Sequence, residues 1–146
     1  MRRPKIVDKT KKRTNFDFLG YTFKKIHQRI RRFPCKKSLR KYKDKIHMET
    51  RRCNGNSLNQ IIETLKPISR GWFEYYKHSI KNIFRELDSW NRMRLRSILR
   101  KRSGRKGRSR CLNDHKKWPN KFFEGMGLHP LEKAYNFHRQ PISSNS

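Results

Sequence analysis

Apolar residues at helical spacing between Leu58 and Tyr76 constrain the fold of this chain more than any other feature of its sequence. They recur at intervals of three and four residues, which places them along one face of an α-helix. The stripe comprises Leu58, Ile61, Ile62, Leu65, Ile68, Trp72, Phe73 and Tyr76. Ser57, with Gln60 three residues later, has the form of a capping box and marks the start of the helix. The sequence therefore predicts a long amphipathic helix as the spine of the fold.

Two residues within the stripe predict local departures from a regular helix. Pro67 lacks a backbone N–H and clashes with the preceding turn, so we expect a kink or a restart near residues 65–66. Gly71 is less favourable in a helix than alanine by about 1 kcal/mol. Its missing side chain predicts the close approach of another backbone.

The segments on either side of this helix predict two more helices. In residues 36–52 a narrow apolar seam is formed by Leu39, Tyr42 and Ile46. In residues 80–102 the apolar stripe comprises Ile80, Ile83, Phe84, Leu87, Trp90, Leu95 and Ile98. Amphipathic helices joined by short connections pack as an antiparallel bundle. We expect its core to be built from Leu65, Ile68, Trp72, Phe73, Tyr76, Phe84, Leu87 and Trp90.

The residues before the bundle predict strands. Residues 16–23 read as one strand with apolar side chains on both faces, and Gly20 in its middle indicates a bulge or a close backbone approach. A turn at residues 27–28 would return the chain through Ile30 and Phe33 as a hairpin, and residues 5–7 read as a further short strand. A strand with two apolar faces needs cover on both sides. Since this chain offers little for the second face, we expect a neighbouring module there.

The predicted fold class is mainly α: a small N-terminal β-hairpin, a three-helix antiparallel bundle and a short helical C-terminal tail. The expected segments are residues 1–33 for the hairpin, 34–103 for the helices, 104–117 for a basic linker and 118–146 for an aromatic tail. The aromatic residues of 118–135 are interpreted as a satellite core rather than as stacking platforms for bases. Residues 141–146 are expected to be a frayed end.

The charge of the chain requires a polyanionic partner. Its 146 residues carry 40 Lys+Arg against 11 Asp+Glu, a net charge of +29, and only 32% are hydrophobic. Such self-repulsion destabilises a small core unless a polyanion relieves it. The basic residues concentrate on both sides of the central helix, in the hairpin with the first helix and in the third helix with the linker.

The third helix carries basic residues on the side opposite its apolar stripe, namely Lys81, Arg85, Arg92, Arg96 and Arg100. Like charges one turn apart destabilise a bare helix, so a row without acidic partners favours phosphates as counterions. Together with the hairpin and first helix, the predicted RNA-binding residues are Lys24, Lys25, Arg29, Arg31, Arg32, Lys36, Lys37, Arg40, Arg70, Lys81, Arg85, Arg92, Arg96, Arg100, Lys101 and Arg102. Because no RNA-recognition or zinc-finger signature is present, we expect recognition of shape and backbone.

Several other chemistries find no support in the sequence. Its acidic residues form no cluster of the kind used in two-metal phosphoryl transfer, and nothing resembles a phosphate-cradling glycine loop. Cys35, Cys53 and Cys111 have neither disulfide-framework nor zinc spacing and are expected to be reduced thiols. No apolar run approaches the length of a membrane span. We therefore expect no catalytic residues, metal or cofactor, and no membrane partner.

Two segments carry a resemblance to a known family. Residues 16–23 (FDFLGYTF) resemble the junction of palm and thumb in group II intron reverse transcriptases. Residues 65–76 (LKPISRGWFEYY) resemble the signature of their maturase-specific thumb, or domain X, and residues 87–96 continue that pattern. Lys66 and Ser69 depart from it, since Asn and Leu are usual at these positions.

The resemblance implies an RNA-binding thumb that grips group II intron RNA, assists its splicing and, in the complete protein, holds the template–primer duplex. Residues 1–33 would be the end of the palm and the hairpin that leads into the thumb. The palm and fingers, with their paired catalytic aspartates, are missing from the sequence. The resemblance therefore implies that this chain alone has no polymerase activity and that it is a piece of a truncated or split reading frame. The expected location is the bacterial cytoplasm or an organelle.

Two alternatives stay open at this stage. The chain could be a general basic RNA- or DNA-binding protein unrelated to introns. It could also be part of an enzyme, if a palm and fingers module is supplied by the same or another chain, against which the aromatic strand would pack.

Overall fold

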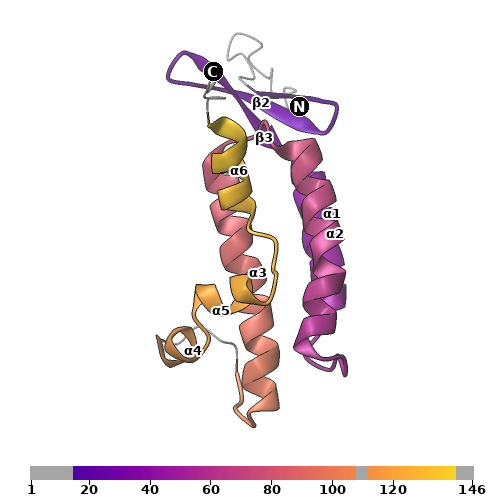
Figure 1. The fold of residues 1–146 in the computed structure, drawn as a ribbon. Helices are drawn as coiled ribbons and strands as arrows, with labels where there is room; N and C mark the ends of the chain where they lie inside the picture. Colours follow the sequence, from indigo (N-terminus) through magenta and orange to yellow (C-terminus); the bar gives the residue numbers. More distant parts are fainter. Residues whose placement is uncertain (1–14, 108–111, 141–146) are drawn as a thin grey trace, which may run out of the picture.

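The computed structural model describes residues 15–107 and 112–140 (Figure 1). A three-stranded antiparallel sheet in the order β1-β2-β3 precedes the helices, which confirms a mainly α fold. The strands are β1 (Asn15–Phe18), β2 (Tyr21–Ile26) and β3 (Arg29–Pro34). The helices are α1 (Lys36–Glu49), α2 (Leu58–Tyr76), α3 (Lys81–Arg102), α4 (Leu112–Lys117), α5 (Asn120–Gly125) and α6 (Leu131–Arg139).

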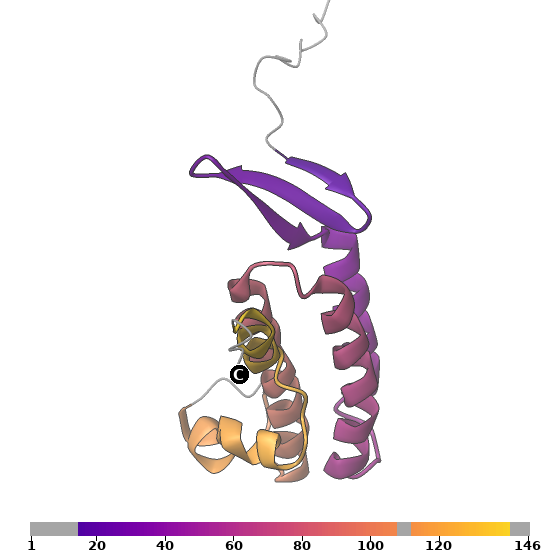
Figure 2. The ribbon, with the colours of Figure 1, turned by 45° about the horizontal axis from the view of Figure 1, so that its top comes forward.

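The long helices form two layers beneath the sheet. Figures 1 and 2 show α1 and α2 side by side on one side of the molecule and α3 with α6 on the other. Helix α1 leads away from the sheet, α2 returns to it and α3 leads away again, as expected for an antiparallel bundle. Helices α4 and α5 lie beside the half of α3 that is farther from the sheet.

Helix α2 forms as its apolar stripe predicts. The capping box is present: the Gln60 backbone N–H donates to Ser57 Oγ (3.3 Å), and the Ser57 N–H donates to Gln60 Oε1 (3.1 Å). The helix continues through the exposed Pro67 without the expected restart. The close approach expected at Gly71 is also wrong, because a Cβ at this position would meet nothing within 4 Å.

One hydrophobic cluster joins all the helical layers. Five of the predicted core residues, Leu65, Phe73, Tyr76, Phe84 and Leu87, are buried, and Ile68, Trp72 and Trp90 are half-buried and pack against the cluster. The cluster also includes four residues of the C-terminal segment: Phe123, Leu128, Leu131 and Tyr135. The interpretation of this segment as a satellite core is therefore wrong, since α6 packs on α3 and completes the main core.

The aromatic segment near the N-terminus forms two strands rather than one. Leu19 and Gly20 make a tight turn, with φ of 51° and 83°, and Phe18 pairs with Tyr21 across it. The predicted close approach at Gly20 is confirmed, because a Cβ there would lie 2.8 Å from Tyr76 Oη. The second turn lies at residues 27–28 as predicted, with both residues in the left-handed region. The strand predicted at residues 5–7 lies outside the described residues, as does the predicted frayed end at 141–146.

Tyrosines attach the sheet to the end of α2. The Tyr21 ring lies 5.9 Å from that of Tyr75 and 5.1 Å from that of Tyr76. The Tyr21 hydroxyl donates to the Tyr75 carbonyl, and the Tyr75 hydroxyl donates to the Leu19 carbonyl. Tyr75 and Tyr76, the last two residues of α2, thus fix the position of the sheet.

A buried carboxylate on α3 caps α6. Asp88, only 6% exposed, accepts hydrogen bonds from the backbone N–H groups of Leu131 and Glu132, both at 2.9 Å. The first amides of a helix have no acceptors within the helix, and Pro130 at the N-cap provides no side-chain acceptor. Burial raises the pKa of the Asp88 carboxyl, and the two backbone donors act in the opposite direction.

Replacing Asp88 with alanine should lower the free energy of unfolding by about 1–3 kcal/mol, because two buried N–H groups lose their acceptor. Urea denaturation of the full chain measures this cost. Glu86→Ala, at an exposed position on the same helix, is the control and should change stability by no more than about 0.5 kcal/mol. Equal stabilities for the two variants would contradict the capping role of Asp88.

Candidate nucleic-acid interface

Outside α3, most of the predicted RNA-binding side chains are accessible. Those classed as exposed are Lys25, Arg29, Arg31, Arg32, Lys36, Lys37, Arg40 and Arg70. Lys24 is half-buried, and its Nζ lies 4.9 Å from the centre of the Phe33 ring. All but Arg70 come from β2, β3 and the first turns of α1, which follow each other in the chain.

We call the exposed cations of this region, Lys25, Arg29, Arg31, Arg32, Lys36, Lys37 and Arg40, the sheet–α1 surface. No aspartate or glutamate occurs between Phe23 and Asp44. The sequence prediction did not include Lys41 and Lys43, two further exposed cations of α1 within the same acid-free run, or Lys45, which follows Asp44. An accessible basic surface without local counterions is the electrostatic footprint of a nucleic-acid-binding protein.

The basic row predicted on the side of α3 opposite its apolar stripe is exposed only in part: Arg85 is exposed, Arg92 and Arg100 are half-buried, and Arg96 is buried. Arg96 is only 2% exposed; its Nε donates to the Trp118 carbonyl (2.9 Å) and its Nη2 to Asn120 Oδ1 (2.8 Å). Arg100 donates to Asp114 Oδ2 (2.7 Å), whose side chain is fully buried. At Arg96 and Arg100 the expected solvent exposure is wrong, because residues 112–120 bind this side of α3.

Most of the other predicted cations of α3 have internal partners or partial burial. Arg85 and Lys81 both contact Glu132 of α6, at 3.1 and 3.7 Å. Arg102 donates to the carbonyls of Asn54 (3.0 Å) and Asn56. Arg92 is half-buried, whereas Lys101 is exposed.

Two arginine side chains of α3 show how the fold uses these charges. Arg94, which the sequence prediction did not include, donates to the carbonyl (2.9 Å) and Oγ1 (3.1 Å) of Thr50 at the end of α1. A cation at a helix C-terminus satisfies carbonyls that have no donor within the helix. Burial lowers the pKa of the Arg96 guanidinium, and the neighbouring Arg92 lowers it further. An arginine stays charged despite such a shift.

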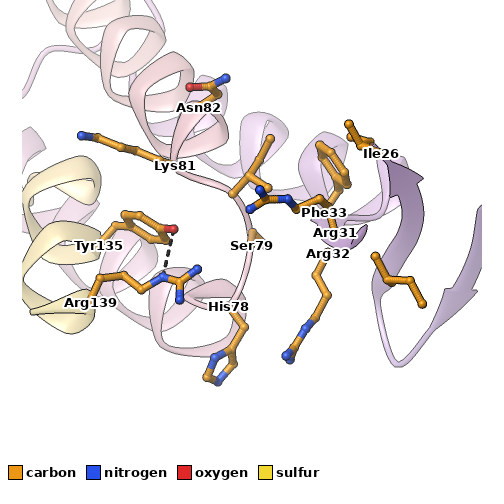
Figure 3. A pocket seen from close by; sticks show the side chains of 12 residues that line it. Ile26, Arg31, Arg32, Phe33, His78, Ser79, Lys81, Asn82, Tyr135 and Arg139 are labelled. Carbon is orange, nitrogen blue, oxygen red and sulfur yellow. Dashed lines mark hydrogen bonds between the residues drawn. The ribbon is translucent and has the colours of Figure 1, made fainter. Parts of the chain in front are cut away.

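The structure brings three of the predicted cations together around one cavity. Arg31 and Arg32 reach it from β3, and Lys81 reaches it from the start of α3 (Figure 3). His78 and Arg139, which the sequence prediction did not single out, also line this cavity. Only the tertiary fold places residues so far apart in the sequence next to one another.

Within the described residues, no group of three or more histidine, cysteine, aspartate or glutamate side chains is placed to hold a metal ion. Cys35 and Cys53 are free thiols, and Cys111 lies outside the described residues. None of the described helices has the length and apolar character needed to cross a membrane.

A family comparison agrees with this fold. The model of the group II intron maturase-specific domain matches residues 39–118, a little over half of the chain. The chain belongs to this family. The match runs from Leu39 in α1 to Trp118, beyond α4, and the sheet, α5 and α6 lie outside it. No curated protein matches the chain at a significant level.

The signature of this maturase-specific domain lies where the bundle meets the sheet. Trp72 packs between the rings of Tyr42 (4.9 Å) and Tyr76 (4.7 Å), and its Nε1 donates to Ser38 Oγ (3.3 Å). Arg70 in the same segment is exposed. The signature therefore contributes mainly to packing, and Arg70 is its one predicted RNA contact.

Replacing Arg96 with glutamine should destabilise the domain by about 1–3 kcal/mol, because the Trp118 carbonyl and the Asn120 side chain lose a buried charged donor. Thermal or urea unfolding measures the change. The charge-matched variant Arg40→Gln, at an exposed position of α1, should stay within about 0.5 kcal/mol of the unmodified chain. If Arg96→Gln were equally mild, the buried position of Arg96 would be contradicted.

Proposed function

We propose that this chain is an RNA-binding module that holds group II intron RNA and assists its folding for splicing, in the bacterial cytoplasm or an organelle. The observation that carries the proposal is the sheet–α1 surface, an exposed run of cations without acidic neighbours in a member of the maturase-specific domain family. Phosphates of a folded RNA are the natural counterions of such a surface.

The sheet–α1 surface fits this role better than α3 does. Its side chains are exposed, whereas the α3 guanidiniums of Arg96 and Arg100 already bind partners inside the fold. A cation that already has a carboxylate or carbonyl partner gives up that interaction when it contacts a phosphate. We therefore assign the main RNA footprint to the sheet and the first half of α1.

Affinity for a folded group II intron RNA should depend steeply on salt. With about 6–10 phosphate contacts, it should fall by about 10³–10⁵-fold between 50 and 200 mM salt. A triple variant, Lys36→Gln with Lys37→Gln and Arg40→Gln, should reduce the slope of log affinity against log salt by about one for each cation that no longer meets a phosphate. Filter binding or fluorescence anisotropy across a salt series measures both slopes.

A charge-matched triple variant distinguishes this footprint from general charge attraction. Lys116, Lys117 and Lys121 are exposed on α4 and α5, far from the sheet, and their replacement by glutamine should leave the slope nearly unchanged. Equal effects of the two triple variants would contradict the footprint. Equal affinity for intron RNA and for duplex DNA at the same salt would favour a general nucleic-acid-binding protein instead.

The exposed aromatic edge of the sheet supports a second interaction. Phe16 and Phe18 on β1 are 57% and 60% exposed, and Leu19 in the following turn is 70% exposed. Monomeric proteins seldom expose adjacent large apolar side chains unless a partner covers them. We propose that this edge docks on a palm and fingers module of the same or another chain. Within that assembly the domain would help to hold the template–primer duplex.

The purified chain alone should give no primer extension, since the proposed catalytic module is a separate part. A co-expressed palm and fingers module should co-purify with it, and Phe18→Ser should weaken this association about tenfold or more, because burying a phenylalanine contributes about 1.5–3 kcal/mol. Phe137→Ser, at a 77% exposed position on α6, is the control and should leave association unchanged. Extension by the chain alone, or equal effects of both variants, would contradict this assignment.

A further inference from the structure

An open cavity of about 420 Å³ lies where the sheet meets the helical bundle. Figure 3 shows its walls: Arg31 and Arg32 extend from the sheet on one side, Lys81 and Arg139 come from the helices on the other, and Ser79 lies between them. The cavity is thus formed by three parts of the chain that are far apart in the sequence.

The charge around this cavity is strongly positive. Four cationic side chains line it, and none of its lining residues is an aspartate or glutamate. Two of the four already have a contact: Lys81 lies 3.7 Å from Glu132, and Arg139 Nε donates to Tyr135 Oη at 3.1 Å. That bond leaves the two terminal nitrogens of the Arg139 guanidinium available for an anion.

The N-terminus of α3 adds backbone donors to the same cavity. Helix α3 is 22 residues long, and its N-cap residue Ile80 makes no side-chain capping bond. The first N–H groups of a helix have no acceptor within it, and the helix dipole is positive at this end. Ile80, Lys81 and Asn82 all line the cavity, so the first turn of α3 lies at its wall. Helix N-termini of this kind bind phosphate in many proteins.

A buried hydroxyl without a partner lies at the same place. Ser79 immediately precedes the N-cap of α3, is only 1% exposed and lines the cavity. Its Oγ has no hydrogen-bond partner among the described residues. Buried hydroxyls in folded proteins are nearly always paired, so this one is a donor without its acceptor. A phosphate oxygen is an acceptor that the surrounding cations would attract.

The cavity also has an apolar part. Ile26, Ile30 and Phe33 of the hairpin line it, and Ile30 is 67% exposed. Burial, together with the charge of Arg32 and of nearby cations, lowers the pKa of His78, so its imidazole is mostly neutral at pH 7 and adds hydrogen-bonding atoms rather than charge. A free phosphate would leave this apolar wall unused, whereas a nucleoside would cover it.

We propose that this cavity binds one unpaired nucleotide of the RNA, with its phosphate at the N-terminus of α3 beside Ser79 and Arg32 and its base against Ile30 and Phe33. This inference rests on the proposed function and adds a specific site to it. A duplex keeps its bases stacked inside and presents only its backbone, but an unpaired nucleotide can turn its base towards apolar side chains. The site would thus direct the domain to a single-stranded segment of the folded RNA.

Binding of a fluorescent ten-uridine RNA to the full chain tests the proposal. Arg32→Gln should weaken binding about tenfold or more, and Ser79→Ala by about two- to tenfold, the loss expected for a charged and a neutral hydrogen bond respectively. Arg51→Gln, which removes an exposed arginine two residues after α1, whose C-terminal end lies far from the sheet, is the matched control and should change affinity less than twofold. Thermal unfolding should show that all three variants are folded.

Competition distinguishes a nucleotide site from a simple anion site. Uridine monophosphate should displace the ten-uridine RNA at a lower concentration than inorganic phosphate does, and Ile30→Ser should remove most of this difference. Equal potency of the two competitors against the unmodified chain would overturn the nucleotide assignment. Losses for Arg32→Gln and Ser79→Ala no larger than that for Arg51→Gln would overturn the site itself.

Binding of the intron RNA in parallel separates the two proposals. If the unmodified chain binds the intron RNA in a salt-dependent way but Ser79→Ala and Ile30→Ser, which remove no cation of the sheet–α1 surface, behave like the control, the cavity proposal fails and the proposed function stands. If the chain fails to bind the intron RNA in dilute buffer, the proposed function fails, whatever the result with uridine monophosphate.

Discussion

The burial of α3 on two opposite sides is the constraint on which the rest of the structure depends. One side packs its leucines and Phe84 into the common hydrophobic cluster. The opposite side meets the C-terminal segment through polar contacts: Arg96 binds the turn before α5, and Arg100 binds the buried Asp114 of α4. Asp88, one helical turn after Phe84 and so on the apolar side of α3, caps α6. Burying charges is costly unless their hydrogen bonds are satisfied. Each of these three side chains has at least one bond shorter than 3 Å to offset that cost.

This arrangement explains why some elements could be predicted from the sequence and others could not. The stripe of α2 and its capping box predicted the correct helix start, because both signals are local and the cap is a reciprocal pair of bonds between Ser57 and Gln60. The predicted exposure of Arg96 and Arg100 on α3 was wrong, because the sequence of a polar helix face is the same whether water or a second layer of protein covers that face. Arg96 donates to the backbone carbonyl of Trp118. Because every residue has a carbonyl, the sequence does not indicate this contact.

The prediction of one strand over residues 16–23 was wrong for a different reason. Most of residues 16–23 favour a strand, and the turn within them places Leu19, a poor residue for positive φ, next to Gly20. The tyrosines of α2 stabilise this turn from outside: Tyr75 binds the Leu19 carbonyl, and the Tyr76 hydroxyl fills the space beside Gly20. Tertiary contacts here override local preference. The candidate site was similarly only half predictable: its exposed cations follow from charge, but the cavity exists only once β3, α3 and α6 have come together.

The internal use of arginine changes how the net charge of +29 should be understood. Cations on α3 act largely as donors that hold connections and helix ends together, as Arg94 does at Thr50 and Arg102 at Asn54. The opposite holds for β3 and the start of α1, where exposed cations have no acidic residue nearby in the sequence. Exposed positive charge without acidic neighbours is therefore dense at the sheet end of the molecule, close to the cavity and to the aromatic edge. A polyanion bound at that end would relieve the self-repulsion without competing for the hydrogen bonds that close the core, so under the proposed function RNA binding and folding would favour each other.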